Sequence, residues 1–156
     1  MESTLKKKVS LELLWWLVTA IVAAVILFPI INNLESYPFF NSNLVFIVVF
    51  ITLTRYAFLL NHTILAKAEL VKVGIVLISV PCIFLLIEGL SNFQSYLDEE
   101  GLNKLMPFMN LDKQQDMINY IKSEMLFFGV GAIIIAILFP FRMIMSIWKN
   151  RNSNNS

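Results

Sequence analysis

The stretch that decides the fold is Asn43-Leu-Val-Phe-Ile-Val-Val-Phe-Ile-Thr-Leu-Thr-Arg-Tyr-Ala-Phe-Leu-Leu-Asn61, which is almost wholly apolar and carries Arg55 well inside it. A hydrocarbon core of about 30 Å needs about 20 apolar residues in a helix, so this stretch is long enough to cross a bilayer. An arginine near the centre of a spanning helix costs about 2.5–3.5 kcal/mol on insertion scales. A chain keeps such a group when an ion-pair partner, a water-filled cavity or the interface satisfies it.

Three further apolar blocks of similar length lie on either side of this stretch. The chain has 156 residues, of which 58% are hydrophobic and 15% charged, more apolar sequence than a soluble domain of this length uses. We predict an all-α fold, a single membrane domain over residues 1–156 built as an integral membrane four-helix bundle. Its four transmembrane helices are predicted at about 11–31, 43–61, 70–90 and 125–148, with a helical extracytoplasmic insertion at 91–123 and a disordered tail at 149–156.

The beginning of the chain resembles a signal peptide but is predicted to stay as the first span. Three lysines, Lys6 to Lys8, precede the apolar run, but the run continues to Ile31 and has no small-x-small cleavage site in the right place. Trp15 and Trp16 lie near its start, and tryptophan prefers the headgroup level of a bilayer. We therefore expect the first membrane interface at this pair.

The distribution of basic residues predicts the orientation of the chain. One predicted side carries Lys6, Lys7, Lys8, Lys67, Lys72, Arg142, Lys149 and Arg151, and the other carries Lys104, Lys113 and Lys122. Cytoplasmic loops of membrane proteins have an excess of Lys and Arg. We predict a multi-pass protein of the bacterial cell inner (plasma) membrane with both termini cytoplasmic and the 91–123 insertion outside.

Apolar spacing in the insertion predicts short helices. Leu102, Leu105, Met106 and Met109 fall at positions i, i+3, i+4 and i+7, which places them on one helical face. Pro107 argues against a single straight helix there. A second helix, capped by Asn110 or Asp112, is predicted to run on into the fourth span.

Arg55 is the first candidate for a functional residue. If the second span enters at Leu44 from outside, Arg55 lies about 16 Å deep at 1.5 Å per residue, past the midplane. We therefore expect its partner at cytoplasmic depth, Glu12 before Glu69, rather than Glu88. A structural ion pair is the first interpretation, with an expected loss of about 1 kcal/mol when Arg55 is removed. A binding or relay role is the second interpretation.

Glu88 and His62 are two further ionisable side chains, for which a functional role is again weighed against a structural one. Glu88 lies a turn inside the outer interface, where it is either a proton or cation site or a carboxylate that reaches the headgroups. His62 is the only histidine and follows the second span directly, where an imidazole meets headgroups and water. A single histidine makes no metal site, so we expect no catalytic or metal role for it.

Prolines and glycines inside the spans predict irregular or close-packed helix positions. Pro81 and Pro140 are expected to kink their helices, because proline removes a backbone donor within a helix. These kinks are static in the first interpretation and hinges of a gate in the second. Gly129 and Gly131 are candidates for helix packing, since small residues let helix backbones approach each other.

The sequence lacks the sets of residues that most enzymatic reactions and cofactors require. The sequence shows no nucleophile–base set, no phosphate-binding glycine loop and no paired histidines for haem, and Cys82 is its single cysteine. We therefore predict no catalytic residue, no metal, no cofactor and no enzymatic activity. The net charge of +1 gives no reason to expect a nucleic-acid partner.

Two hypotheses for the function remain. The first is a non-catalytic membrane subunit or scaffold, surrounded by the lipid bilayer, which binds an envelope membrane protein or forms a homo-oligomer through the 91–123 insertion or a helix face. The alternative is a small oligomeric channel or transporter that uses Arg55 and Glu88. The two differ in whether Arg55 and Glu88 face one interior cavity or are held in ion pairs and headgroups.

Overall fold

The computed structural model of the chain describes residues 2–60, 63, 65 and 68–154, without the side chains of 2–5, 153 and 154. These residues form α1 (Glu2–Asn33), α2 (Phe40–Leu59), α3 (Glu69–Glu99), the 3₁₀ turn η3 (Leu102–Leu105) and α4 (Leu111–Asn154), and no strand is found among them. Of the described helices, four are long and apolar enough to cross a membrane, over Lys6–Asn33, Phe40–Leu59, Glu69–Glu99 and Leu111–Asn152. The prediction of an all-helical chain with four helices of spanning length is confirmed.

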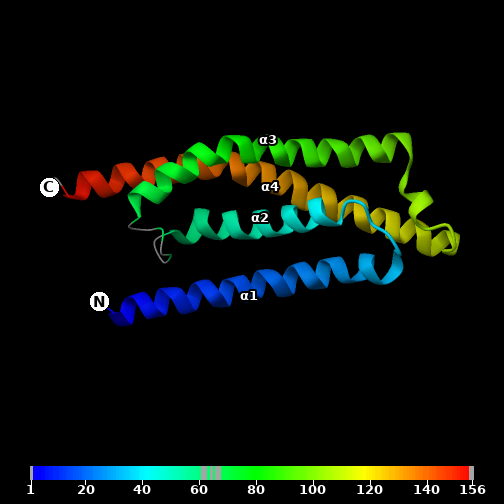
Figure 1. Ribbon diagram of the computed structural model, residues 1–156, viewed down its shortest axis with the longest axis horizontal. Coiled ribbons are helices and arrows are strands. Elements are labelled where there is room, and N and C mark those ends of the chain that lie inside the picture. Colours follow the sequence, from blue (N-terminus) through cyan, green and yellow to red (C-terminus); the bar gives the residue numbers. More distant parts are fainter. Residues whose placement is uncertain (1, 61–62, 64, 66–67, 155–156) are drawn as a thin grey trace.

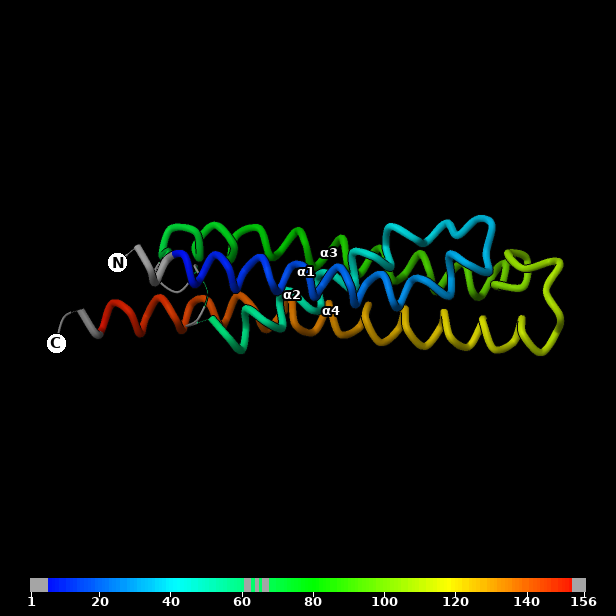
Figure 2. Tube along the Cα trace, turned by 90° about the horizontal axis from the view of Figure 1, so that it is seen from below, coloured from blue at the N-terminus to red at the C-terminus, as the bar shows by residue number. Residues whose placement is uncertain are grey.

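The four long helices lie side by side along one axis (Figure 1). Both chain termini lie at one end, which we call the termini end, and η3 lies at the other, the distal end (Figure 1). α4 packs along both α2 and α3, whereas α1 packs mainly on α2 and α2 meets α3 at few points. Figure 2 shows α4 along one side of the molecule and α1 and α3 along the other. The helices therefore form an open arch rather than a closed four-helix bundle.

A buried stripe on α4 holds this arch together. Its members lie three, four or seven positions apart, as one face of a helix requires, and are Ile121, Met125, Ala132, Ala136, Phe139 and Met143. Gly129 and Gly131 lie beside the stripe at points of close contact: an added Cβ would lie 2.9 Å from Cδ1 of Leu90 at Gly129, and 2.8 Å from the ring of Phe50 at Gly131. The glycines thus allow α4 to approach α3 and α2 closely, as predicted.

The distal end is more regular than the predicted insertion. α3 continues to Glu99, past its predicted end at about residue 90, and α4 already begins at Leu111. Between them only η3 remains, so the predicted helix over Leu102–Met109 is a single 3₁₀ turn. Gly101, with φ of 73°, ends α3 in a conformation that favours glycine, and Pro107 prevents η3 from continuing. The prediction that the second helix runs on into the fourth span is confirmed.

Of three further predictions, the tail differs from the structure, the kinks at Pro81 and Pro140 stay predictions, and His62 lies outside the described chain. The prediction of a disordered tail from residue 149 is wrong for residues 149–154, because α4 continues to Asn154 and Arg151 pairs with Glu69 at 3.7 Å. α3 and α4 continue through Pro81 and Pro140, and Ser79 near the first proline donates a hydrogen bond to the carbonyl of Val76. His62 lies outside the described residues.

Candidate functional site

The ion pair predicted for Arg55 is present. Nη1 of Arg55 on α2 lies 2.8 Å from Oε2 of Glu12 on α1, and both side chains are at most 10% exposed. The hydroxyl of Tyr56 donates a second hydrogen bond to the same carboxylate oxygen at 3.0 Å. Glu69 instead pairs with Arg151, and Glu88 is exposed on α3. The estimated depth of Arg55 in the membrane therefore identified Glu12 correctly as its partner.

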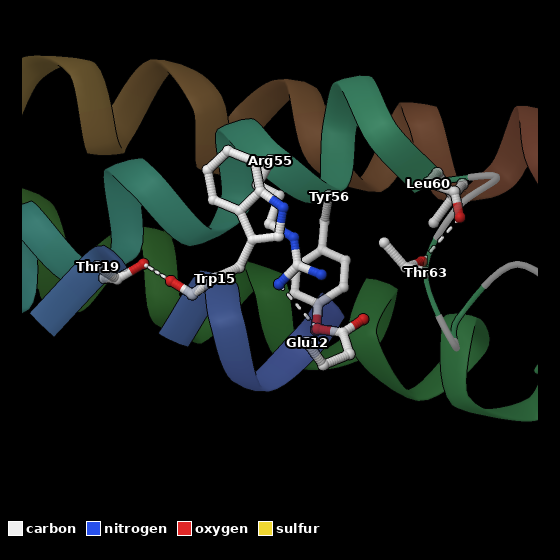
Figure 3. A network of polar contacts seen from close by, with 7 residues as sticks. All are labelled: Glu12, Trp15, Thr19, Arg55, Tyr56, Leu60 and Thr63. Atoms are coloured by element: carbon white, nitrogen blue, oxygen red, sulfur yellow. Dashed lines mark hydrogen bonds and ion pairs between the residues drawn. The ribbon is translucent and has the colours of Figure 1, made fainter. Parts of the chain in front are cut away.

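Two aromatic rings enclose the guanidinium of Arg55 (Figure 3). Its central carbon lies 5.5 Å from the ring centroid of Trp15 and 5.1 Å from that of Tyr56. Rings at this distance attract a cation through their electron-rich faces, the more so where water is excluded. Arg55 is thus neutralised by one carboxylate and covered by two rings, which leaves it little access to a substrate.

Basic side chains at the termini end also connect helices. Lys72 is fully buried, and its Nζ donates to the hydroxyl of Ser146 on α4 at 2.9 Å. Nε of Arg142 donates to the carbonyl oxygen of Ala57 on α2 at 2.9 Å. Sequence reasoning counted Lys72 only as a loop charge and missed its burial. Its place three residues before Ile75 and four before Val76, on the packed face of α3, is the signal that could have shown it.

A second buried polar cluster at the distal end was missed from the sequence. Nδ2 of Asn43 on α2 donates to Oε1 of Glu124 on α4, and it lies 3.5 Å from the hydroxyl oxygen of Tyr37 in the α1–α2 connector. Asn43 is 0% exposed and Glu124 8%. Burial is the main cause that raises the pKa of Tyr37 above its ordinary value, so its phenol stays neutral. Glu124 follows Ile121 by three residues, and this helical spacing could have placed it on the packed face.

An apolar groove between α2 and α3 encloses a cavity of about 410 Å³. We call it the α2–α3 groove. Its walls are five residues of α2 between Val45 and Leu53, six residues of α3 between Ile75 and Leu86, and Trp16 of α1, and its floor is Ala136 and Phe139 of α4. No charged side chain lines it within the described part of the chain. At the distal end the helices close on each other, since an added Cβ at Gly89 would lie 3.3 Å from the ring of Phe46.

Arg55 and Glu88 lie outside the lining of the α2–α3 groove. Glu88 lies on the exposed surface of α3. Pro81 is also exposed, while the single cysteine, Cys82, is exposed on the groove itself. Within the part of the chain that the structure describes, no group of three His, Cys, Asp or Glu side chains could hold a metal ion.

Comparison with protein-family models, with curated proteins and with solved structures finds no match to this chain. The function must therefore be inferred from the geometry of the polar clusters and of the groove.

Proposed function

We propose that this chain is a non-catalytic subunit of a membrane-protein complex, and that it binds a transmembrane helix of a partner protein in the α2–α3 groove. The observation that carries the proposal is a contrast within the molecule. Arg55 is paired with Glu12, and Lys72 is hydrogen-bonded to Ser146, so both buried cations already have partners within the chain. The groove, in contrast, is lined by no charged side chain among the described residues.

The shape and lining of the groove suit a helix. Its α3 wall runs from Ile75 to Leu86, roughly 17 Å along the helix axis at 1.5 Å per residue, about half of a hydrocarbon core. Ser79, Cys82 and Ala136 are small side chains along this length. Helices associate in membranes through packing at small residues rather than through the hydrophobic effect. A partner helix seated here would contact α2, α3 and α4 together and close the arch.

The proposal includes a location and an orientation. We place the chain in a bacterial inner (plasma) membrane with the termini end in the cytoplasm. The supporting observation is that both termini lie at one end of the molecule (Figure 1). Lys8, before the first apolar segment, and Arg142 and Lys149, late in α4, add basic residues to this end. The distal end, with η3, would then face outward.

We rank the channel or transporter second. It needs Arg55 and Glu88 to act on one permeation path. In the structure Arg55 is covered by Trp15 and Tyr56, and Glu88 is exposed on α3. In an oligomeric channel, contacts between copies would have to bring Arg55 and Glu88 onto one permeation path.

The test uses the single cysteine as a probe. A photo-activated maleimide attached to Cys82 in native membranes should cross-link to a transmembrane segment of another protein, which mass spectrometry of the cross-linked peptide identifies. A matched control carries Cys82→Ser and Val80→Cys, because Val80 is 55% exposed on the same helix but does not line the groove. The control should give little of this product.

A groove-filling variant gives the second arm of this test. Ser79→Phe should abolish the cross-link and co-purification of the identified protein, whereas Val80→Phe should leave both unchanged. Adducts with lipid alone would contradict the proposal, as would adducts with a second copy of this chain alone.

A further inference from the structure

We propose that Glu124 is a proton-binding site: its carboxyl is held neutral at physiological pH as an acid–amide pair with Asn43, and this pair fastens the beginning of α2 to α4. The site is separate from the α2–α3 groove and from the Arg55–Glu12 ion pair. Its ligand is a proton taken from the water at the distal end.

The first step is a count of hydrogen-bond donors and acceptors. The two N–H bonds of the Asn43 amide are directed at Oε1 of Glu124 and at the hydroxyl oxygen of Tyr37. Oε2 of Glu124 and Oδ1 of Asn43 are both buried and have no hydrogen-bond partner among the residues that the structure describes. One proton on Oε2 of Glu124 can be donated to Oδ1 of Asn43, which would satisfy both oxygens at once. If the amide is turned by 180°, its carbonyl oxygen faces Oε1, and the carboxyl must again carry the proton.

The second step concerns charge. An ionised carboxyl that is buried without a cation is costly, and such groups take up a proton instead. No salt bridge to Glu124 is found within the described part of the chain. The titratable groups that face it are the phenols of Tyr37 in the connector and Tyr120 on α4, and Lys122 on the same helix is exposed. Glu12, at the other end of the bundle, shows the contrast because Arg55 neutralises it.

The third step distinguishes a proton from a metal ion. Oxygen-binding cations such as Mg²⁺ and Ca²⁺ take six or more oxygen ligands. This site offers the two unpartnered oxygens of Glu124 and Asn43, with the hydroxyl of Tyr37 beside them. A single proton matches this set, whereas a cation would lack most of its ligands.

The Glu124–Asn43 pair joins α2 to α4 at the distal end, so its loss would weaken the contact between these two helices. Asn43 is in the first turn of α2, directly after the connector that packs Phe39 against Phe93 and Tyr96 of α3. Loss of the proton would leave a buried charge between α2 and α4, and water would have to enter to solvate it. The distal end of α2 should then separate from α4 while the termini end stays packed.

Infrared spectroscopy of the full-length protein in lipid vesicles tests the proposal. Wild type at pH 7 should show the C=O stretching band of a protonated carboxylic acid, shifted in D₂O. The band should be absent in Glu124→Gln and retained in the control Glu88→Gln, which removes an exposed carboxylate near the same end. A wild-type spectrum at pH 7 with carboxylate bands only would overturn the proposal, and this result needs no variant to fold.

Two further measurements separate the alternatives. Glu124→Gln keeps an amide that can pair with Asn43, so its melting temperature at pH 7 should equal that of wild type, whereas Asn43→Leu should lower it. In wild type at pH 7, the spectrum should not change when NaCl replaces choline chloride. A Na⁺-dependent carboxylate band that disappears in Glu124→Gln would show a metal site and overturn the proton-binding proposal.

Discussion

Substitution of Arg55 by methionine tests the ion pair at the termini end most directly. The variant keeps an unbranched apolar side chain but removes the guanidinium, so the carboxylate of Glu12 stays buried with the hydroxyl of Tyr56 as its remaining donor. Removal of one partner of a buried pair costs about 3–5 kcal/mol in soluble proteins, whereas polar contacts in membrane proteins average about 0.6 kcal/mol and reach about 1.7. We expect a loss of about 3 kcal/mol rather than the loss of about 1 kcal/mol predicted from the sequence, because the side chain of Glu12 is at most 10% exposed.

The reciprocal substitution should cost less. Glu12→Gln leaves Arg55 with the faces of Trp15 and Tyr56, and a cation over a ring is stabilised by about 0.5–2 kcal/mol. We expect a loss of about 2 kcal/mol for this variant and about 3 kcal/mol for the double variant. The coupling energy, the sum of the two single losses minus the double loss, is then about 2 kcal/mol.

The assay is reversible unfolding of the four proteins in mixed detergent micelles, with the helical signal followed by circular dichroism. The exposed pair Glu69–Arg151 is the internal control, because surface ion pairs couple by about 0–1 kcal/mol. Losses at Arg55 and Glu12 that add to within about 0.5 kcal/mol would refute the reasoning, since they would mean that the pair contributes no interaction of its own.

Three further predictions concern other parts of the chain. Gly131→Val places a side chain against the ring of Phe50 and should cost about 1–3 kcal/mol of unfolding free energy in the same assay, whereas Gly74→Ala, where the space is open, should not. Lys72→Met removes the hydrogen bond to Ser146 but also a buried cation, so its unfolding free energy should change by less than about 1 kcal/mol; a larger loss would show that the lysine charge itself stabilises the fold. In a cysteine-free background, Glu100→Cys should react with an impermeant maleimide from outside intact cells; protection until the cells are permeabilised would reverse the proposed orientation.

Depth and periodicity predicted the parts of the structure that depend on single helices. The four spanning segments follow from apolar length, and Arg55–Glu12 follows from the position of each residue along its own span. Such arguments need the distance along one helix axis, which 1.5 Å per residue supplies. The termini end was therefore partly predictable.

Contacts that depend on how helices turn toward each other could not be predicted in the same way. Asn43 and Glu124 are 81 positions apart, and each was assigned to the edge of a predicted segment, where polar residues normally meet water. Only the packing of α2 on α4 buries both. The groove likewise follows from the separation of α2 and α3, which no residue in either helix indicates alone.

The central position of α4 has a consequence for synthesis, because the ribosome makes α4 after the other three long helices. When α3 emerges, it meets α2 at few points, so its main packing surface remains without a partner until the stripe on α4 arrives. At about 5–20 residues per second, the 44 residues of α4 take roughly 2–9 s to make. During that interval α3 is held in the membrane by its own apolar length alone. A chain that stops after Glu99 would keep three inserted helices and lose the one that joins them.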